Sequence, residues 1–156
     1  MDSSVLEALI VHVCETVIAH TEELTALDQA IGDGDHGLNM KRGFEAVLAK
    51  VDMIAALPPA DALEAAGMAL VMKVGGASGP IYGTFFMALG KAWPAELTRE
   101  GFTGAFAAAI DAVKARGKSE PGMKTLLDVL VPLLAALREG ADTARLRVVA
   151  TTAAQA

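Results

Sequence analysis

The spacing of helix-breaking residues limits the fold of this chain more than any other feature of its sequence. Glycine- and proline-containing breaks recur about every 20 to 25 residues, and the apolar residues between them follow the period of amphipathic helices. No segment alternates apolar and polar residues as a half-buried strand does. The pattern therefore predicts an all-α, up-and-down antiparallel fold of about six to seven helices in one domain, residues 1–156.

Local signals place the helix boundaries. Ser4 and Glu7 match the S-x-x-E capping box, which predicts a first helix running from about Ser4 to Leu27. Later helices are expected at about residues 38–51, 60–73, 80–93, 98–117, 122–140 and from 142 onward.

Four single residues refine this prediction. Thr98 and Asp142 are expected to cap the two helices that follow them. Gly117 is expected just past a helix end, and Pro132 is expected to kink the helix that contains it.

Composition restricts the partners and the location. Because aromatic residues make up only 4% of the chain and hydrophobic residues 53%, Ala, Leu, Val and Met must fill the core. The net charge of −6 argues against nucleic acid or an anionic membrane as a partner. The first residues lack the basic start of a signal peptide, and no apolar run reaches the length of a membrane span, so we expect a cytoplasmic protein.

Three residues with reactive or ligating side chains are interpreted as structural. Cys14 is the only cysteine, which excludes a disulfide framework and a cysteine-based zinc site, and we expect a packed, unreactive thiol. His12 and His20 lie on the first predicted helix without neighbouring ligands, and we expect structural or surface roles for both.

The segment "DQAIGDGDHGLNMKRG" places Asp28, Asp33 and Asp35 within eight residues. Two unit charges about 4 Å apart repel by about 4 kcal/mol at an effective dielectric constant near 20. Carboxylate oxygens are ligands that Mg²⁺ accepts, so a bound cation would turn this repulsion into attraction. The other interpretation of the segment is a solvated surface turn.

Three better-known loop motifs do not fit this segment. The glycines match G-x-G-x-x-G, but the preceding residues are helical and aspartates would repel a bare pyrophosphate. A P-loop would need Lys and Ser/Thr where Leu38 and Asn39 stand. An EF-hand that begins at Asp33 would need glutamate where Phe44 stands.

A second glycine-rich segment, "GGASG", spans residues 75–79. Its backbone N–H groups and the Ser78 hydroxyl suit a phosphate group, and a helix is expected to start beside it. Lys41 and Arg42 could meet the same phosphates. Glycines between helices are usually only turns, but a carboxylate cluster in the same small domain makes a Mg²⁺–phosphate ligand the better interpretation.

Three long blocks in this sequence, "LDQAIGDGDHGLNMKRGF", "VGGASGPIYGTFF" and "RGKSEPGMKTLLDVLVP", resemble the nucleotide-binding L-subunit family of dihydroxyacetone kinases in order and spacing. Together they span Leu27 to Pro132. The resemblance implies an eight-helix antiparallel barrel that binds ADP or ATP at one end through two Mg²⁺ ions.

The resemblance also implies roles for single residues. Asp28, Asp33 and Asp35 occupy the positions of the metal-binding carboxylates, and Thr125 lies near the nucleotide with Lys124 and Asp128 beside it. The positions that contact the phosphates are those of His36, Asn39, Gly76, Ala77, Ser78 and Gly79.

An L subunit of this kind passes a phosphoryl group to dihydroxyacetone, which a separate K subunit holds as a hemiaminal on histidine. The resemblance further implies recharging of the bound ADP by an M subunit of the phosphoenolpyruvate-dependent phosphotransferase system. The chain could also form a homodimer. No nucleophile on this chain is expected. The alternatives are an ATP-dependent kinase subunit for a related short ketose such as erythrulose, a truncated non-catalytic Mg²⁺–nucleotide module, and a helical interaction protein without a ligand.

The chain departs from the family pattern in two places. Met123 stands where the family usually has an acidic residue. The family's later G-R-A-x-[YF]-x-G-x-R and D-P-G-A segments do not occur before the final "ATTAAQA". We therefore expect a C-terminally short L-type domain without the arginine that would stabilise the transferred phosphoryl group, and the loss of such an arginine costs orders of magnitude in rate.

Overall fold

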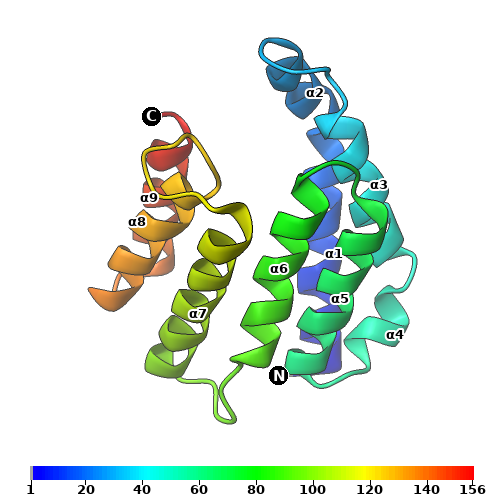
Figure 1. Cartoon of the computed structure of the whole chain (residues 1–156). Helices are drawn as coiled ribbons and strands as arrows, with labels where there is room; N and C mark the ends of the chain where they lie inside the picture. The colour runs from blue at the N-terminus through cyan, green and yellow to red at the C-terminus, as the bar shows by residue number, and fades with distance from the viewer. Residues whose placement is uncertain (1) are drawn as a thin grey trace.

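The computed structural model describes residues 2–156, which form nine helices and no strand within that range (Figure 1). This confirms the all-α prediction, with more helices than the six to seven expected. The helices are α1 (Ser3–Ala19), α2 (Thr21–Gln29), α3 (His36–Leu48), α4 (Val51–Ala55), α5 (Pro59–Lys73), α6 (Ser78–Lys91), α7 (Arg99–Gly117), α8 (Leu127–Arg138) and α9 (Thr143–Ala154).

The prediction of one long first helix is wrong, because α1 and α2 meet at His20 with a bend of 46°. At the break, two side chains contact backbone carbonyl groups near the end of α1. The Thr21 hydroxyl donates to the carbonyl of Ile18 at 2.6 Å, and Nδ1 of His20 lies 2.7 Å from the carbonyl of Thr16. Side chains that bond nearby carbonyls compete with the backbone N–H groups that would continue a helix.

The predicted capping box at the start of the chain is also wrong. The helix begins one residue earlier, at Ser3, and Asp2 caps it by accepting a hydrogen bond from the N–H of Ser4. Glu7 therefore lies beyond the N3 position that a capping box requires.

Later boundaries agree with the sequence in part. Thr98 and Asp142 cap α7 and α9 as predicted, and each accepts a hydrogen bond from a backbone N–H three residues later. Gly117 is the last helical residue, and Lys118 takes the left-handed conformation expected of Gly117, with φ of 49°. Two further differences are the unpredicted short helix α4 and the start of α8 at Leu127.

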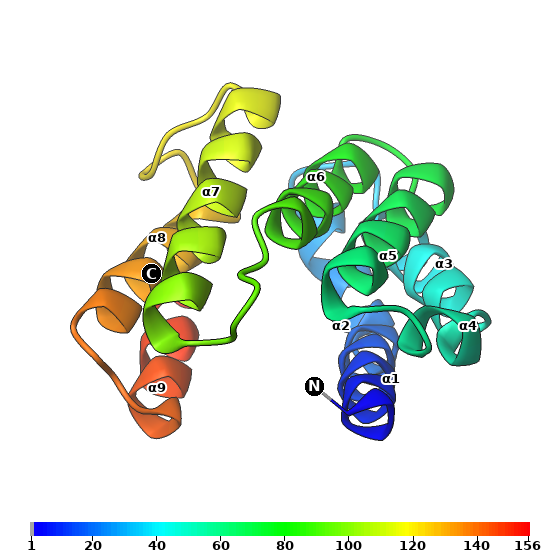
Figure 2. The same ribbon diagram turned by 90° about the horizontal axis from the view of Figure 1, so that it is seen from below.

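Helices α5 and α6 approach closely through a pair of facing glycines. A Cβ atom built on Gly67 would lie 2.8 Å from the carbonyl oxygen of Gly83, and one built on Gly83 would lie 2.7 Å from that of Gly67. Because real Cβ atoms do not come this close to backbone, only glycine lets the two helices pack at this distance. The views in Figures 1 and 2 show the two helices side by side.

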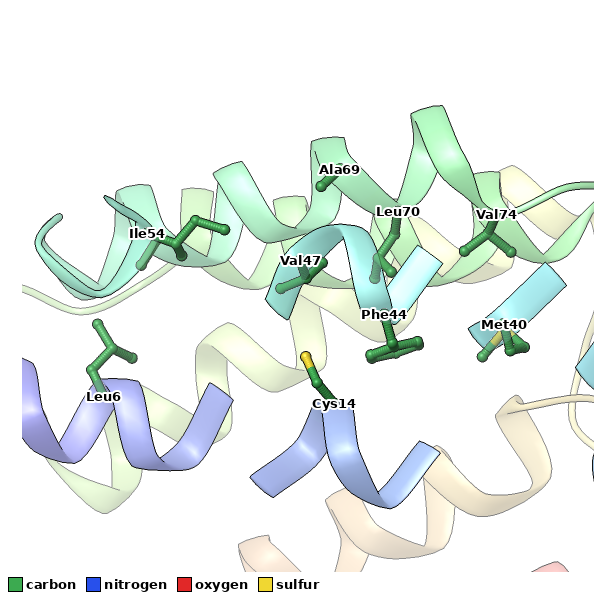
Figure 3. Packing of buried hydrophobic residues seen from close by; sticks show 10 residues of the cluster. Leu6, Cys14, Met40, Phe44, Val47, Ile54, Ala69, Leu70 and Val74 are labelled. Carbon is green, nitrogen blue, oxygen red and sulfur yellow. The ribbon is translucent and has the colours of Figure 1, made fainter. Parts of the chain in front are cut away.

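Helix α6 stands between two groups of helices, α1–α5 and α7–α9 (Figure 2). One core cluster joins α1, α3, α4 and α5, where the Cys14 side chain points from α1 toward Phe44 and Val47 (Figure 3). A second cluster lies mainly between α7 and α8. Phe86 of α6 packs on the first cluster and Phe85 on the second, so burial on both sides fixes α6 between them.

An apolar cavity of about 380 Å³ lies between these helices. None of the acidic or glycine-loop residues lines it, so it is separate from the chemistry indicated by the sequence. Its walls include Leu6, Ile10, Phe44, Leu70, Phe86 and Trp93.

No single helix within residues 2–156 is long and apolar enough to cross a membrane. The bent pair of α1 and α2 reaches the necessary length and apolarity only when both helices are counted together.

Candidate functional site

The three aspartates of the first loop come together where α2 ends and α3 begins. Each of Asp28, Asp33 and Asp35 offers a carboxylate oxygen, and these oxygens lie within 4.8 Å of one another. Asp28 is half-buried, whereas Asp33 and Asp35 are exposed. We call Asp28–Asp35 the acidic loop.

Backbone hydrogen bonds shape the acidic loop around Asp28. Its carbonyl oxygen accepts from the N–H of Gly32 at 2.6 Å, and its Oδ2 accepts from the N–H of His36 at 3.2 Å. The first bond reverses the chain directly after α2, and the second fixes the Asp28 carboxylate against the start of α3. The loop is therefore held by backbone donors, while the exposed carboxylates face outward.

This donor set fits a hard divalent cation. Three carboxylates within 4.8 Å repel one another, and a cation such as Mg²⁺ would relieve that repulsion while accepting phosphate oxygens as further ligands. The structure brings the three predicted ligands together. That they bind metal stays a prediction.

The second loop joins the acidic loop through a side-chain contact. Ser78 is the first residue of α6, and its Oγ lies 3.1 Å from Nδ1 of His36, the first residue of α3. The amino ends of two helices therefore meet beside the acidic loop. Backbone N–H groups at helix amino ends attract anions, so the two ends together suit a phosphate group.

Asn39 is buried between α3 and the second loop, with only 5% of its surface exposed. Its Oδ1 accepts a hydrogen bond from Nη2 of Arg42. A Cβ atom on Gly75 would lie 2.6 Å from the same Oδ1, so glycine is required for the loop to close over the amide. The structure thus places His36 and Asn39 beside the second loop, and that these residues and Ser78 contact phosphate stays a prediction.

The two basic residues of α3 have protein partners of their own. Arg42 donates to Asn39, and Nζ of Lys41 lies 3.9 Å from Oε1 of Glu45. The prediction that both meet phosphate missed these contacts. The spacing of three residues between Asn39 and Arg42, one turn of helix, was the available signal for the first contact.

Thr125 lies in a third loop, between α7 and α8. Its backbone N–H donates to Oδ2 of Asp128 at 2.9 Å, and its Oγ1 accepts from the N–H of Leu127 at 3.3 Å. The N–H of Gly122 donates to Oδ1 of Asp128. These backbone donors, Gly122 first, hold the pKa of the Asp128 carboxyl below its usual value.

The helix end that leads into the third loop lies against α6, the helix that begins at Ser78. A Cβ atom on Gly117 would lie 3.2 Å from Cδ1 of Ile81, which is one helical turn beyond Ser78. Leu126 and Ile81 also pack against the same core cluster. All three loops therefore lie at one end of the helices, the upper end in Figure 1, with no hydrogen bond between the third loop and the other two among residues 2–156.

Known families and proteins include relatives of this chain. The family model described as DAK2 domain matches residues 30–156. The ADP-binding subunit DhaL of the PEP-dependent dihydroxyacetone kinase of Escherichia coli (strain K12) is 47% identical over 124 residues, which cover 78% of this chain. The corresponding subunit of kinase 1 from Listeria innocua is 43% identical over 126 residues, 80% of this chain.

A solved structure resembles the whole fold. The dihydroxyacetone kinase from C. freundii, in complex with AMP-PNP and Mg²⁺, matches 97% of this chain with a TM-score of 0.78 and 26% identity. The match covers 28% of that kinase chain. The present chain spans 59% and 64% of the lengths of the E. coli and L. innocua subunits.

Proposed function

Because this chain belongs to the DAK2 domain family, we propose that it is the ADP- or ATP-carrying subunit of a dihydroxyacetone kinase. The observation that carries the proposal is the convergence of Asp28, Asp33 and Asp35 beside the paired helix amino ends of His36 and Ser78. An acidic cluster attracts a cation, and the adjacent helix amino ends attract an anion. A Mg²⁺–nucleotide supplies both charges, whereas a lone cation or a lone anion supplies only one.

In this proposal the carboxylates of Asp28, Asp33 and Asp35 hold Mg²⁺ ions, two by resemblance to the family. Bound Mg²⁺ would neutralise the charge on the phosphate oxygens. Ser78, Asn39 and the backbone of Gly76, Ala77 and Gly79 would bind and orient the phosphates. His36 would contact a phosphate or keep Ser78 in place through the 3.1 Å contact between their side chains.

The chain's own contribution to the reaction is positioning. Phosphoryl transfer depends mainly on alignment and on stabilisation of charge, so it needs no nucleophile from this chain. The acceptor would be dihydroxyacetone held on a separate K subunit, and an M subunit of the phosphotransferase system would recharge the ADP. The expected location is the cytoplasm, where nucleotides are abundant.

Calorimetric titration tests the binding part of this proposal. ADP should bind the 156-residue chain in the presence of Mg²⁺ and fail to bind after chelation by EDTA. Binding that does not depend on Mg²⁺, or no binding under either condition, would overturn it.

A second assay separates a kinase subunit from a non-catalytic nucleotide module. The chain, loaded with Mg²⁺–ATP, is mixed with a K subunit and either dihydroxyacetone or erythrulose. Formation of one phosphorylated ketose identifies the substrate. Tight nucleotide binding without product in either mixture would favour the non-catalytic module.

A further inference from the structure

Asn39 is the one buried residue within residues 2–156 whose side chain carries an amide, a hydroxyl or a charge, and the two ends of its amide have different surroundings. Its Oδ1 accepts a hydrogen bond from Nη2 of Arg42, whereas its Nδ2 donates to no group of the described chain. No buried side-chain nitrogen or oxygen in that range lacks a hydrogen-bond partner, so this Nδ2 must reach the surface. Asn39 therefore offers a free donor at the end of a buried side chain.

The free amide nitrogen lies beside the second glycine-rich loop. A Cβ atom built on Gly75 would lie 2.6 Å from Oδ1 and 3.1 Å from Nδ2 of Asn39, so the amide group packs against the backbone of this loop. The loop leads into Ser78, whose Oγ lies 3.1 Å from Nδ1 of His36, one turn before Asn39 on α3. Phosphate oxygens are strong acceptors, so a phosphate at this place would need donors around it.

Arg42 decides which end of the Asn39 amide is free. A guanidinium carries five N–H donors and no acceptor, so Arg42 can bond only to the oxygen of the amide. If the amide turned over, Nδ2 would lie against the guanidinium, and two donors would oppose each other. Its oxygen would then take the free place beside the second loop and repel a phosphate. The bond from Arg42 therefore selects the amide orientation that a phosphate needs.

Arg42 lies farther from the amino end of α3 than Asn39 does. The helix begins at His36, so the backbone of Arg42 is about 9 Å along it at 1.5 Å per residue. The guanidinium reaches back one turn to Asn39, and no carboxylate forms a salt bridge with it within residues 2–156. A charged donor also polarises the amide, which strengthens the hydrogen bond that Nδ2 can donate. Arg42 can therefore act on a ligand without touching it.

We propose that Arg42 is a positioning residue, which fixes the side-chain amide of Asn39 so that Nδ2 donates to a phosphate oxygen of the bound nucleotide. This inference rests on the proposed function. It gives two neighbours on α3 different tasks, because Asn39 touches the ligand and Arg42 touches Asn39. Its consequence is that Arg42 contributes nothing to binding once Asn39 is removed.

A double-mutant cycle tests this consequence, with the affinity for Mg²⁺–ADP measured by calorimetry. Asn39→Ala should weaken binding at least about tenfold, the effect of one hydrogen bond to a charged group. Arg42→Met, which keeps an apolar stem and removes the donors, should weaken binding at least about fivefold. In the Asn39→Ala background, Arg42→Met should change the affinity by less than about twofold, because the two residues act as one unit.

Two further variants sharpen the cycle. Asn39→Asp keeps the shape of the side chain and can still accept from Arg42, but it has no N–H donor, so it should lose at least as much affinity as Asn39→Ala. Lys50→Met is the matched control for Arg42→Met, since it removes one positive charge at an exposed position just after α3. This control should bind Mg²⁺–ADP as the unchanged chain does.

Nuclear magnetic resonance gives a readout that needs no ligand. In the unchanged chain the side-chain N–H₂ of Asn39 should show a nuclear Overhauser effect to Gly75, because Nδ2 lies next to this residue. Arg42→Met should weaken that effect as the amide turns over, whereas Lys50→Met should leave it unchanged. A general loss of stability would not move this one signal selectively.

Four results would overturn the positioning role. They are equal losses of affinity from Arg42→Met in both backgrounds, no loss in either background, normal affinity in Asn39→Asp, and an unchanged Overhauser effect in Arg42→Met. Failure of the unchanged chain to bind Mg²⁺–ADP would instead overturn the proposed function. The Overhauser measurement would still report whether Arg42 orients the amide, so the two failures are distinguishable.

Discussion

The acidic loop and residues 122–125 of the third loop, which we call the Gly122 turn, lie at the same end of the molecule, yet they use aspartate carboxylates in opposite ways. The Asp128 carboxylate accepts N–H groups from Gly122 and Thr125. In the acidic loop, within the described residues 2–156, only Asp28 accepts a hydrogen bond with its side chain. A carboxylate bonded by backbone donors completes the protein's own structure. Exposed carboxylates held close together are suited to a cation from outside.

The largest expected effect removes a carboxylate from the acidic loop. Asp33→Ala or Asp35→Ala should weaken Mg²⁺-dependent ADP binding by at least about 100-fold. Removing a residue that only hydrogen-bonds a metal ligand already costs up to about 100-fold, and these aspartates are proposed as ligands themselves. The ligand-free protein should melt at the same or a higher temperature, because repulsion among the carboxylates falls. Calorimetry and thermal unfolding measure the two effects.

Asp111→Ala is the control for this prediction, since it removes an exposed carboxylate far along the chain from the loop. Normal ADP affinity in both loop variants would show that the acidic loop is only a solvated turn, and the contrast with Asp128 would lose its meaning.

A smaller effect is expected at the contact between the two phosphate-side loops. Ser78→Ala removes the 3.1 Å contact with His36 and one hydroxyl that could bind phosphate. The loss of one hydrogen bond predicts about tenfold weaker Mg²⁺–ADP binding and a stability loss of about 1 kcal/mol. Ser3→Ala, which also removes one hydroxyl hydrogen bond, to the carbonyl of Ala55 and outside the three loops, is the matched control. Equal affinities for the Ser78→Ala and Ser3→Ala variants would mean that Ser78 takes no part in binding.

Acid should weaken the Gly122 turn over a limited pH range. The pKa of Asp128 is lowered from 3.8 by the backbone donors, so its contribution to stability is complete above the unfolded-state pKa. That contribution is lost as the pH falls through the folded-state pKa, which lies below 3.8. The free energies of unfolding of the unchanged protein and of Asp128→Asn should therefore converge at the acid end. A nuclear magnetic resonance titration of Asp128 with its midpoint at or above 3.8 would contradict this assignment.

The smallest effect is expected at Cys14, which belongs to neither loop. Burial raises the pKa of its thiol to about 11, and only 2% of the residue is exposed. The thiol should not react with a thiol reagent at pH 8 until the protein unfolds, and Cys14→Ser should leave ADP affinity unchanged. Rapid modification of the folded protein would show that the core around α1 opens more readily than its packing indicates.

The sequence predicted the parts of the molecule whose structure is set locally. Helical periodicity and the caps at Thr98 and Asp142 depend on residues a few positions apart. The closeness of the three carboxylates in the acidic loop could also be predicted from the sequence. They are near one another in the chain, and the glycines between them let the loop turn sharply.

The remaining features depend on contacts that the sequence pattern does not display. The helix breaks at His20, where the side chains of His20 and Thr21 contact backbone carbonyls near the end of α1. The apolar stripe in the sequence continues across this break and gives no sign of it. The role of Asp128 depends on the left-handed backbone of Gly122 and Lys124. Pro121 followed by Gly122 was a turn signal in the sequence that argued against starting the predicted helix at residue 122, whereas α8 begins at Leu127.

The bend at His20 has a consequence for how firmly the acidic loop is anchored. Beyond the bend, α2 contains no buried residue, so this helix, which carries Asp28, adds little to the hydrophobic core. Segments with few buried contacts open at low free-energy cost without global unfolding. A cation held by Asp28, Asp33 and Asp35 would then hold α2 against α3. Release of the ligand would require only local unfolding of α2. Slower amide exchange in α2 than in α5 before Mg²⁺ is added would exclude this behaviour.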